Sequence, residues 1–377
     1  MTAHRQSHNP ARSRATTVCA LFGLASSVLV PMTEASAAPM GTNLFAPGTV
    51  VIAQGGTIAG GVQYTGPASG KGANVERNGE VDFYPPGSNG DVAPEASFTK
   101  DMYGPTDMAF DPSGDLWVAN INVPSIVELT RAQLAMPNPV PAVVISSSSH
   151  SLDFVSDLAF DSSGNLWVVA DYTGRVYEYA QAELAASGKP KPVTTLSDLP
   201  SAPIGEAFDA GGNLWVTTVT TTGKPCPLGC VVEFPKAELA MAHPAPSVVI
   251  SSIGGVYMAF TPSGDMWVVT GGPGQDGCFG SPCTNQLIEL TKAQLAASGS
   301  PVPAVTIGST AAGSLWGPYG VAIAPHGGIW VSNFYKPTAV EYGSRQLSAP
   351  GGSPTPLRSI VGPKTGMNFP SYVVTVP

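Results

Sequence analysis

One twelve-residue sequence motif occurs five times in this chain and limits its possible folds more than any other feature. The copies are AFDPSGDLWVAN (109–120), AFDSSGNLWVVA (159–170), AFDAGGNLWVTT (207–218), AFTPSGDMWVVT (259–270) and AIAPHGGIWVSN (322–333). Each copy is an apolar run, a turn containing Gly and a second apolar run, which is the pattern of a β-hairpin. The tryptophans of successive copies are 50, 48, 52 and 63 residues apart, the repeat length of a propeller blade.

Two further apolar runs follow every copy of the motif. In the first repeat they are SIVELT (125–130) and AVVIS (142–146), with a short polar segment between them. Four short strands with no long helix predict one antiparallel blade. At the N-terminus only three such runs occur, and SYVVTVP (371–377) supplies a fourth. The sequence therefore predicts an all-β, six-bladed β-propeller of four-stranded blades, in which the C-terminal strand completes the N-terminal blade.

The start of the chain has the form of a secretory leader. Basic residues end at Arg14, an apolar core spans 18–30, and Ala35, Ser36 and Ala37 form a small-residue cleavage site. We therefore expect a signal peptide at 1–37 and a propeller domain at 38–377, secreted or periplasmic, with no membrane span once the leader is removed. The formal net charge of −9 excludes nucleic acid as a partner, because phosphate binding needs clustered Lys and Arg.

Four cysteines follow the leader, in two close pairs. In an exported chain this spacing favours two local disulfides, Cys226–Cys230 and Cys278–Cys283. A zinc site made of the four thiolates is the alternative, since short-spaced pairs of cysteines are also typical of structural zinc.

The first strands of a propeller surround its central axis. At one equivalent position these strands carry Asp107, Asp157, Gly205, Tyr257, Gly320 and Tyr372, and Glu206 stands where other copies have Met or Leu. Acids from three consecutive blades would repel one another in a concave, partly dry place, and a divalent cation would relieve that repulsion. The sequence predicts a Ca²⁺ or Mg²⁺ site formed by Asp107, Asp157 and Glu206.

Aromatic residues occupy the remaining part of the expected mouth. Tyr257, Trp316, Tyr319 and Tyr372 can stack on a sugar or an aromatic ring, and we predict that they bind the ligand. The alternative is a one-residue slip of the strand, which would turn Glu206 to solvent and leave Asp107 and Asp157 as loop caps.

The repeats resemble NHL-repeat propellers and their relatives, the gluconolactonase (regucalcin)-like family and virginiamycin B lyase. The resemblance rests on the signature G-[ND]-L-W-V between strands and covers 105–343. It implies a central divalent metal held where first strands begin. The matching positions are Thr106, Ser156, Ile204, Val256, Tyr319 and Ser371, and none is a strong ligand. The His and Glu that the lyase relatives place around magnesium have no repeat-matched His here.

We therefore expect a monomeric binding protein that takes a small molecule, a carbohydrate or a protein at its axial mouth. A metal-dependent hydrolase (lactonase) or lyase is the first alternative, and a protein-interaction scaffold is the second. Shared architecture does not decide among them.

Overall fold

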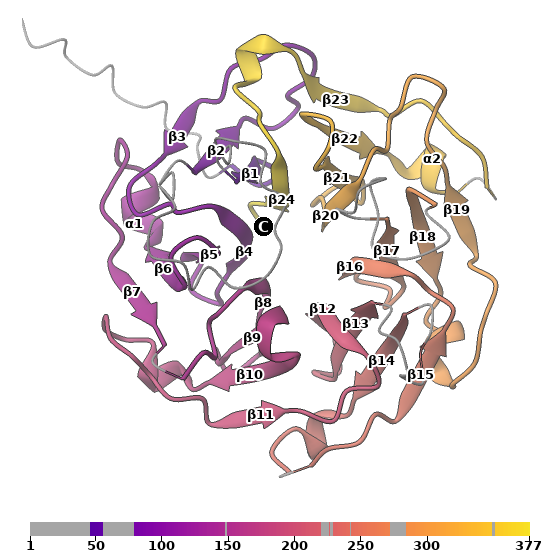
Figure 1. The fold of residues 1–377 in the computed structure, drawn as a ribbon. Helices are drawn as coiled ribbons and strands as arrows, with labels where there is room; N and C mark the ends of the chain where they lie inside the picture. The colour runs from indigo at the N-terminus through magenta and orange to yellow at the C-terminus, as the bar shows by residue number, and fades with distance from the viewer. Residues whose placement is uncertain are drawn as a thin grey trace, which may run out of the picture. The chain divides into compact units, whose positions relative to one another are not determined.

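The computed structural model describes residues 46–55, 79–147, 149–219, 226, 229–241, 243–271, 284–348 and 351–377, all within one compact unit, Met40–Pro377. In these residues the chain forms six antiparallel sheets of four strands each. The sheets are arranged around an axis, with the first strand of each nearest the centre (Figure 1). The predicted six-bladed β-propeller is confirmed.

Blades 1 to 3 follow one another along the chain. Blade 1 contains β4 (Pro105–Phe110), β5 (Leu116–Asn120), β6 (Ser125–Leu129) and β7 (Val143–Ser146). Blade 2 contains β8 (Val155–Phe160), β9 (Leu166–Ala170), β10 (Arg175–Tyr179) and β11 (Thr194–Leu196). Blade 3 contains β12 (Ala202–Phe208), β13 (Leu214–Val219), β14 (Cys230–Phe234) and β15 (Val248–Ser251).

Blades 4 and 5 continue in the same way, and blade 6 joins the two ends of the described chain. Blade 4 contains β16 (Gly255–Phe260), β17 (Met266–Thr270), β18 (Gln286–Leu290) and β19 (Val305–Ile307). Blade 5 contains β20 (Pro318–Ile323), β21 (Ile329–Asn333), β22 (Thr338–Tyr342) and β23 (Arg358–Val361). Blade 6 contains β24 (Pro370–Thr375), β1 (Val50–Gln54), β2 (Glu80–Tyr84) and β3 (Ala96–Phe98).

Blade 6 closes the ring as the sequence predicted. The C-terminal β24 pairs antiparallel with β1, with Val51 opposite Val374, and the two strands lie side by side near the centre of Figure 1. A closed ring leaves no first strand without neighbouring blades on both sides, which removes an edge that could pair with another chain.

An aspartate organises the repeated hairpin turn. In blade 3, Asp209 Oδ1 accepts hydrogen bonds from the backbone N–H groups of Gly211 (2.8 Å) and Asn213 (3.0 Å). Its Oδ2 accepts from Asn213 Nδ2 (2.9 Å) and from the indole Nε1 of Trp215 (3.1 Å). Blades 1 and 2 repeat the arrangement with Asp111 and Asp161. The acids of these turns therefore act as turn caps, a role that Asx turns commonly fill.

The tryptophan fixed by this turn lies between blades. Trp215 is 3% exposed and packs with Phe260 of blade 4, with 6.0 Å between ring centroids. Trp117 meets Phe160, and Trp167 meets Phe208, at 5.8 and 5.9 Å. Each large ring removes apolar surface of two adjacent sheets from water, which is the main stabilising contribution available to a propeller.

The two ends of the blades differ in structure. One end carries the hairpin turns and short helical turns between third and fourth strands: α1 (Arg131–Leu134), α2 (Ser344–Leu347) and the 3-10 turns Gln181–Glu183, Lys236–Glu238 and Gln294–Ala296. Thr130 and Gln133 form a capping box that starts α1. The other end, here called the mouth face, carries the loops between second and third strands and the loops that lead from one blade to the next.

Cys226 and Cys230 form the predicted disulfide. Cys278, Cys283 and the leader at 1–37 lie outside the described residues.

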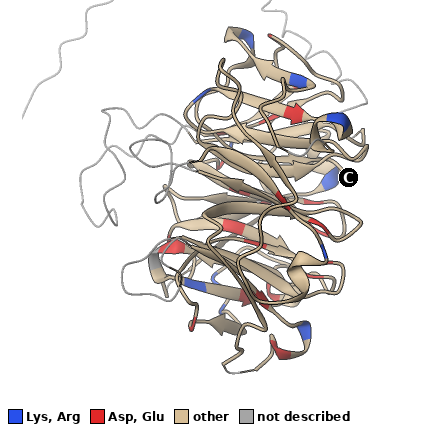
Figure 2. Cartoon of the chain, turned by 90° about the vertical axis from the view of Figure 1, so that its right-hand side faces the viewer, with Lys and Arg blue, Asp and Glu red and all other residues tan. Residues whose placement is uncertain are grey.

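No helix in the described part of the chain is long and apolar enough to cross a membrane. In Figure 2 the positions of charged residues are dispersed over the blades, and only 11% of the residues of the chain are charged.

Candidate functional site

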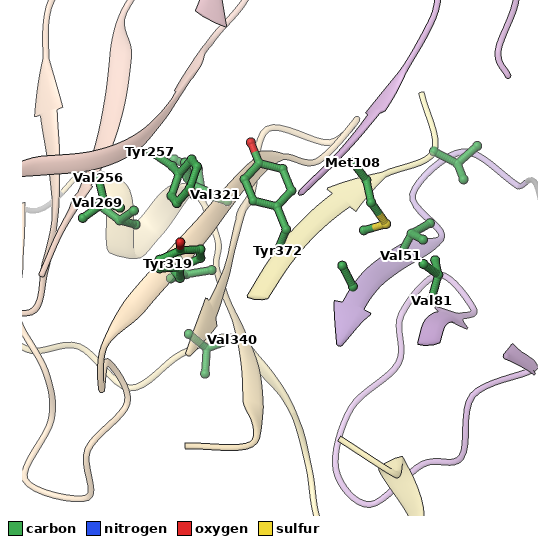
Figure 3. Packing of buried hydrophobic residues seen from close by; sticks show 14 of the residues in the cluster. Val51, Val81, Met108, Val256, Tyr257, Val269, Tyr319, Val321, Val340 and Tyr372 are labelled. Atoms are coloured by element: carbon green, nitrogen blue, oxygen red, sulfur yellow. The ribbon is translucent and has the colours of Figure 1, made fainter. Parts of the chain in front are cut away.

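The first strands bring all three predicted acids and three of the four predicted aromatic residues together at the axis. Asp107, Asp157 and Glu206 are 0, 1 and 3% exposed. Tyr257 is fully buried, and Tyr319 and Tyr372 are each 8% exposed. Figure 3 shows the three tyrosines side by side with apolar neighbours. The axis in this region is filled by side chains.

The tyrosines pack against one another and across the ring. The ring centroid of Tyr257 lies 4.6 Å from that of Tyr319 and 5.2 Å from that of Tyr372. The Tyr257 hydroxyl donates to the Ser156 carbonyl at 2.8 Å, so blade 4 is bonded directly to blade 2. Burial raises the pKa of Tyr257 well above its usual value, and its hydroxyl stays neutral as a donor.

Asp157 is the centre of the axial hydrogen-bond network. Its Oδ1 accepts from Leu158 N (3.0 Å) and its Oδ2 from Glu206 N (2.5 Å), and the Tyr372 hydroxyl and the Asp107 carboxyl bond to it as well. Burial raises the pKa of Asp157 to about 7. Burial, together with the charge of Asp157, raises the pKa of Asp107 well above its usual range. Both carboxyl groups therefore hold a proton more tightly than a free aspartate does.

Two glycines make room for this network. A Cβ on Gly205 would lie 2.4 Å from the Val256 carbonyl oxygen and 3.2 Å from Asp157 Oδ2. A Cβ on Gly320 would lie 2.7 Å from the backbone nitrogen of Val373. The first strands approach so closely at these points that no other residue fits without movement.

Glu206 is buried without a partner for its carboxylate. Its side chain remains inside the ring, so the one-residue slip that would turn it to solvent does not occur. Neither Oε1 nor Oε2 accepts a hydrogen bond, and Asp107 Oδ1 also lacks a donor. Burial, and then the charge of Asp157, raise the pKa of Glu206 well above its usual range. A buried carboxyl of this kind can hold a proton or bind a cation.

The arrangement offers three free oxygens to a cation: both of Glu206 and Oδ1 of Asp107. Both oxygens of Asp157 already accept backbone N–H groups. Among the described residues, Asp111, Asp115 and Glu128 are the acidic group whose oxygens all lie within 4.8 Å of one another. The axial acids do not form so compact a group. Asp111 and Asp115 both hold backbone N–H groups at the opposite end of blade 1.

The fourth predicted aromatic residue, Trp316, lies away from the axis in an open pocket of about 490 Å³ on the mouth face. Its side chain is 54% exposed, whereas the tryptophans of the repeats are at most 3% exposed. The pocket lies between blades 4 and 5 and is lined by Thr284, Asn285, Ser309, Thr310, Ala311, Ala312, Gly313, Leu315, Trp316, Tyr335 and Lys336.

Polar groups of the pocket are fixed by the loops around them. Lys336 Nζ donates to the carbonyls of Ala312 (2.7 Å) and Gly313 (2.8 Å), and Asn285 Oδ1 accepts from Gly317 N at 3.1 Å. Of the lining residues, Lys336 is the charged one. The pocket can therefore stack a ring on Trp316 while the ammonium group and the Asn285 amide donate to its substituents.

Sequence reasoning did not select Tyr335 or Lys336. Both follow β21 in the segment NFYKP (333–337), a loop between second and third strands. The repeat pattern does place this loop on the mouth face. It does not show that the loop meets the segment that contains Trp316, because the pattern defines strands and not contacts between loops.

Comparisons with known proteins agree on architecture. Neither a protein-family model nor a curated protein matches the chain. A protein of unknown function from Bacteroides caccae has a TM-score of 0.50 at 11% identity, over 88% of this chain and 99% of its own. A chain of a Nidogen/Laminin complex has a TM-score of 0.52 at 11% identity, over 87% and 98%. The chain shares their fold.

Virginiamycin B lyase from Staphylococcus aureus is also found, with a TM-score of 0.41 and 13% identity over 64% of this chain and 67% of its own. The fold itself rests on the six four-stranded sheets and on the two structures named above. At such identities the likeness carries no statement about activity.

The buried Glu206 carboxyl generates a prediction about pH. Its pKa is raised in the folded state, so the native protein binds a proton that the unfolded chain has released. The free energy of unfolding should then fall as the pH rises from the ordinary value of 4.5 through neutral pH, by up to about 1.4 kcal/mol per pH unit. Glu206→Gln keeps the shape and removes this titration, so it should flatten the pH dependence and stabilise the protein above neutral pH.

Urea unfolding of both proteins at a series of pH values measures this effect. Asp82, whose pKa burial raises to about 7, titrates in wild type and variant alike. Asp157 is coupled to Glu206 by charge, so the difference between the two curves reports Glu206 together with its effect on Asp157. Parallel curves would contradict the assignment of a raised pKa to this residue.

Proposed function

We propose that this protein is an exported β-propeller that binds a ligand in the Trp316 pocket on its mouth face. The observation that carries the proposal is an open pocket of about 490 Å³ beside a tryptophan that is 54% exposed. Binding pockets commonly combine an aromatic wall with a few fixed polar groups. The leader pattern and the Cys226–Cys230 disulfide support export.

The pocket is a better candidate than the axis itself. Tyr257, Tyr319 and Tyr372 are buried and hold one another in place, so a ligand could reach them only by displacing packed side chains. These tyrosines instead form the floor that supports the mouth face, because the Tyr319 ring lies 5.6 Å from that of Phe334 in the adjoining loop.

The fluorescence of Trp316 can report the binding of a ligand. The other five tryptophans are buried between blades, so acrylamide should quench the fluorescence of Trp316 preferentially. We predict that a bound ligand protects this fluorescence and that Trp316→Ala lowers ligand affinity about tenfold or more, as for an aromatic anchor in a pocket. Screening a library of small molecules and oligosaccharides for protection is the measurement.

Met241→Ala is the control, because Met241 is 53% exposed and follows the helical turn Lys236–Glu238 at the opposite end of blade 3. Its affinity should equal that of the wild type. If no small molecule or oligosaccharide protects Trp316, the pocket proposal fails and a protein-interaction scaffold becomes the better account.

The unpartnered oxygens at the axis favour a second candidate function. We propose that Ca²⁺ or Mg²⁺ binds weakly to Glu206 and Asp107, with Asp157 as their neighbour. A cation would satisfy oxygens that are otherwise buried without donors. A metal-dependent hydrolase or lyase would need such an ion to polarise a substrate oxygen.

Calorimetric titration with Ca²⁺ and with Mg²⁺ tests this second candidate. We predict binding that weakens at low pH, because protons and the cation compete for Glu206, and that is lost in Glu206→Gln. Asp111→Asn is the control, since it alters the acidic group at the opposite end of blade 1. Equal heats for the wild type and Glu206→Gln would remove the axial metal.

A further inference from the structure

We infer that the pocket is one end of an aromatic strip across the mouth face and that its ligand is a chain of pyranose sugars. The aromatic strip consists of Trp316, Tyr335, Phe334 and Phe369. This inference rests on the proposed function, because it names the ligand class of the same site and extends the site from blade 5 toward blade 6.

Three rings of the strip are in contact, and Trp316 adjoins them through the pocket. Trp316 and Tyr335 line the pocket together. The ring centroid of Phe334 lies 5.2 Å from that of Tyr335 and 5.5 Å from that of Phe369. Trp316 is 54% exposed, and Tyr335 and Phe369 are each 38% exposed. Large apolar side chains are usually buried, so three partly exposed rings connected through a fourth form a surface suited to an extended ligand.

The backbone is arranged to present these rings. Phe369 immediately precedes β24 and has φ of 52°, a left-handed conformation that is rare for bulky residues. The equivalent positions before β4, β8 and β20 are Gly104, Phe154 and Gly317, with φ of 71°, 54° and 60°. At Gly317 a Cβ would lie 2.6 Å from Tyr335 Cδ2. Glycine at 317 thus makes room for the Tyr335 ring, whereas the loop before β24 accepts a strained residue that adds a ring.

The polar groups beside the strip indicate sugar. A pyranose ring has apolar C–H faces that an aromatic ring can cover and hydroxyl groups at its edge that need hydrogen-bond partners. Lys336 Nζ uses two of its three protons on Ala312 and Gly313 and keeps one for a ligand. Asn285 keeps its amide nitrogen as a donor, because its bond to Gly317 uses the oxygen. Thr310 and Ser309 add hydroxyls at the same wall.

A succession of rings matches a chain of sugars better than a single small aromatic molecule. One flat molecule would occupy the pocket and leave Phe334 and Phe369 uncovered. Tyr335 lies at 86° to Phe334, and Phe369 is tilted from it by 47°. Consecutive sugar units would therefore meet ring faces and ring edges in turn while their hydroxyl groups remained in water.

Binding of cellohexaose, xylohexaose, mannohexaose and their monosaccharides, measured by calorimetry and by protection of Trp316 from acrylamide, tests the inference. We expect at least one hexasaccharide to bind about tenfold or more tightly than its monosaccharide. Trp316→Ala and Phe369→Gly should each weaken that binding about tenfold. Phe369→Gly suits the left-handed backbone, so its unfolding temperature should not fall, and Met241→Ala should bind as the wild type does.

Three outcomes would overturn the inference and distinguish it from the proposed function. Hexasaccharide binding that Phe369→Gly leaves unchanged would confine the site to the pocket and remove the strip. Trp316-dependent binding of indole-3-acetate, a flat aromatic probe, with no binding of any sugar would overturn the sugar class and keep the pocket as a ligand site. No Trp316-dependent binding of either class would overturn both.

Discussion

In blades 1 to 3 the fold depends on one hydrogen-bonded unit, the aspartate that holds both its own hairpin turn and the tryptophan packed between two blades. In blade 3 the Asp209 carboxylate accepts from two backbone N–H groups and from the indole of Trp215. A buried indole needs an acceptor, and a tight turn needs its N–H groups satisfied. One side chain meets both needs, so the ring of Trp215 enters the next blade in a fixed orientation and joins two sheets.

This unit constrains the hairpin-turn end of the blades. Asn213 Oδ1 also accepts from Lys236 N, so the same turn positions the helical turn beside it. At the mouth face an asparagine that ends the second strand has a similar role in two blades: Asn120 Oδ1 accepts from Tyr103 N and Asn333 Oδ1 from Trp316 N, both at 2.9 Å. The longest spacing between repeated tryptophans is 63 residues, from Trp267 to Trp330. Most of the extra length lies between β17 and β18, where Thr284 and Asn285 line the Trp316 pocket. The departure from regular repetition coincides with the candidate site.

The sequence was sufficient to predict the blades, their number and the closing strand, because short apolar runs and glycine turns that recur at a fixed spacing are local signals. It also placed Asp107, Asp157 and Glu206 at the axis, since equivalent positions of repeated strands occupy equivalent places in a ring. It did not reveal that Tyr257 would reach the Ser156 carbonyl and help to close the axis. How six inner strands fill a shared space depends on side-chain packing and on close approaches such as that at Gly205, neither of which a repeat pattern encodes.

The same limit explains why only part of the candidate site was predicted. Trp316 was identifiable as the tryptophan outside the repeat, but Tyr335 and Lys336 belong to a different loop, and their meeting depends on how blade 5 packs on blade 4. The left-handed backbone of Phe369 has no signature in composition either.

Thermal and urea unfolding of Asp209→Ala, compared with Asp198→Ala, tests most directly whether the turn aspartate holds the blades together. Asp198 is a suitable reference because its side chain is 70% exposed. We expect Asp209→Ala to lower the free energy of unfolding by about 1–3 kcal/mol, since it removes the acceptor of the Trp215 indole and of two turn N–H groups. Asp198→Ala should change it by less than about 0.5 kcal/mol. Equal stability of the two variants would contradict the role given to this carboxylate.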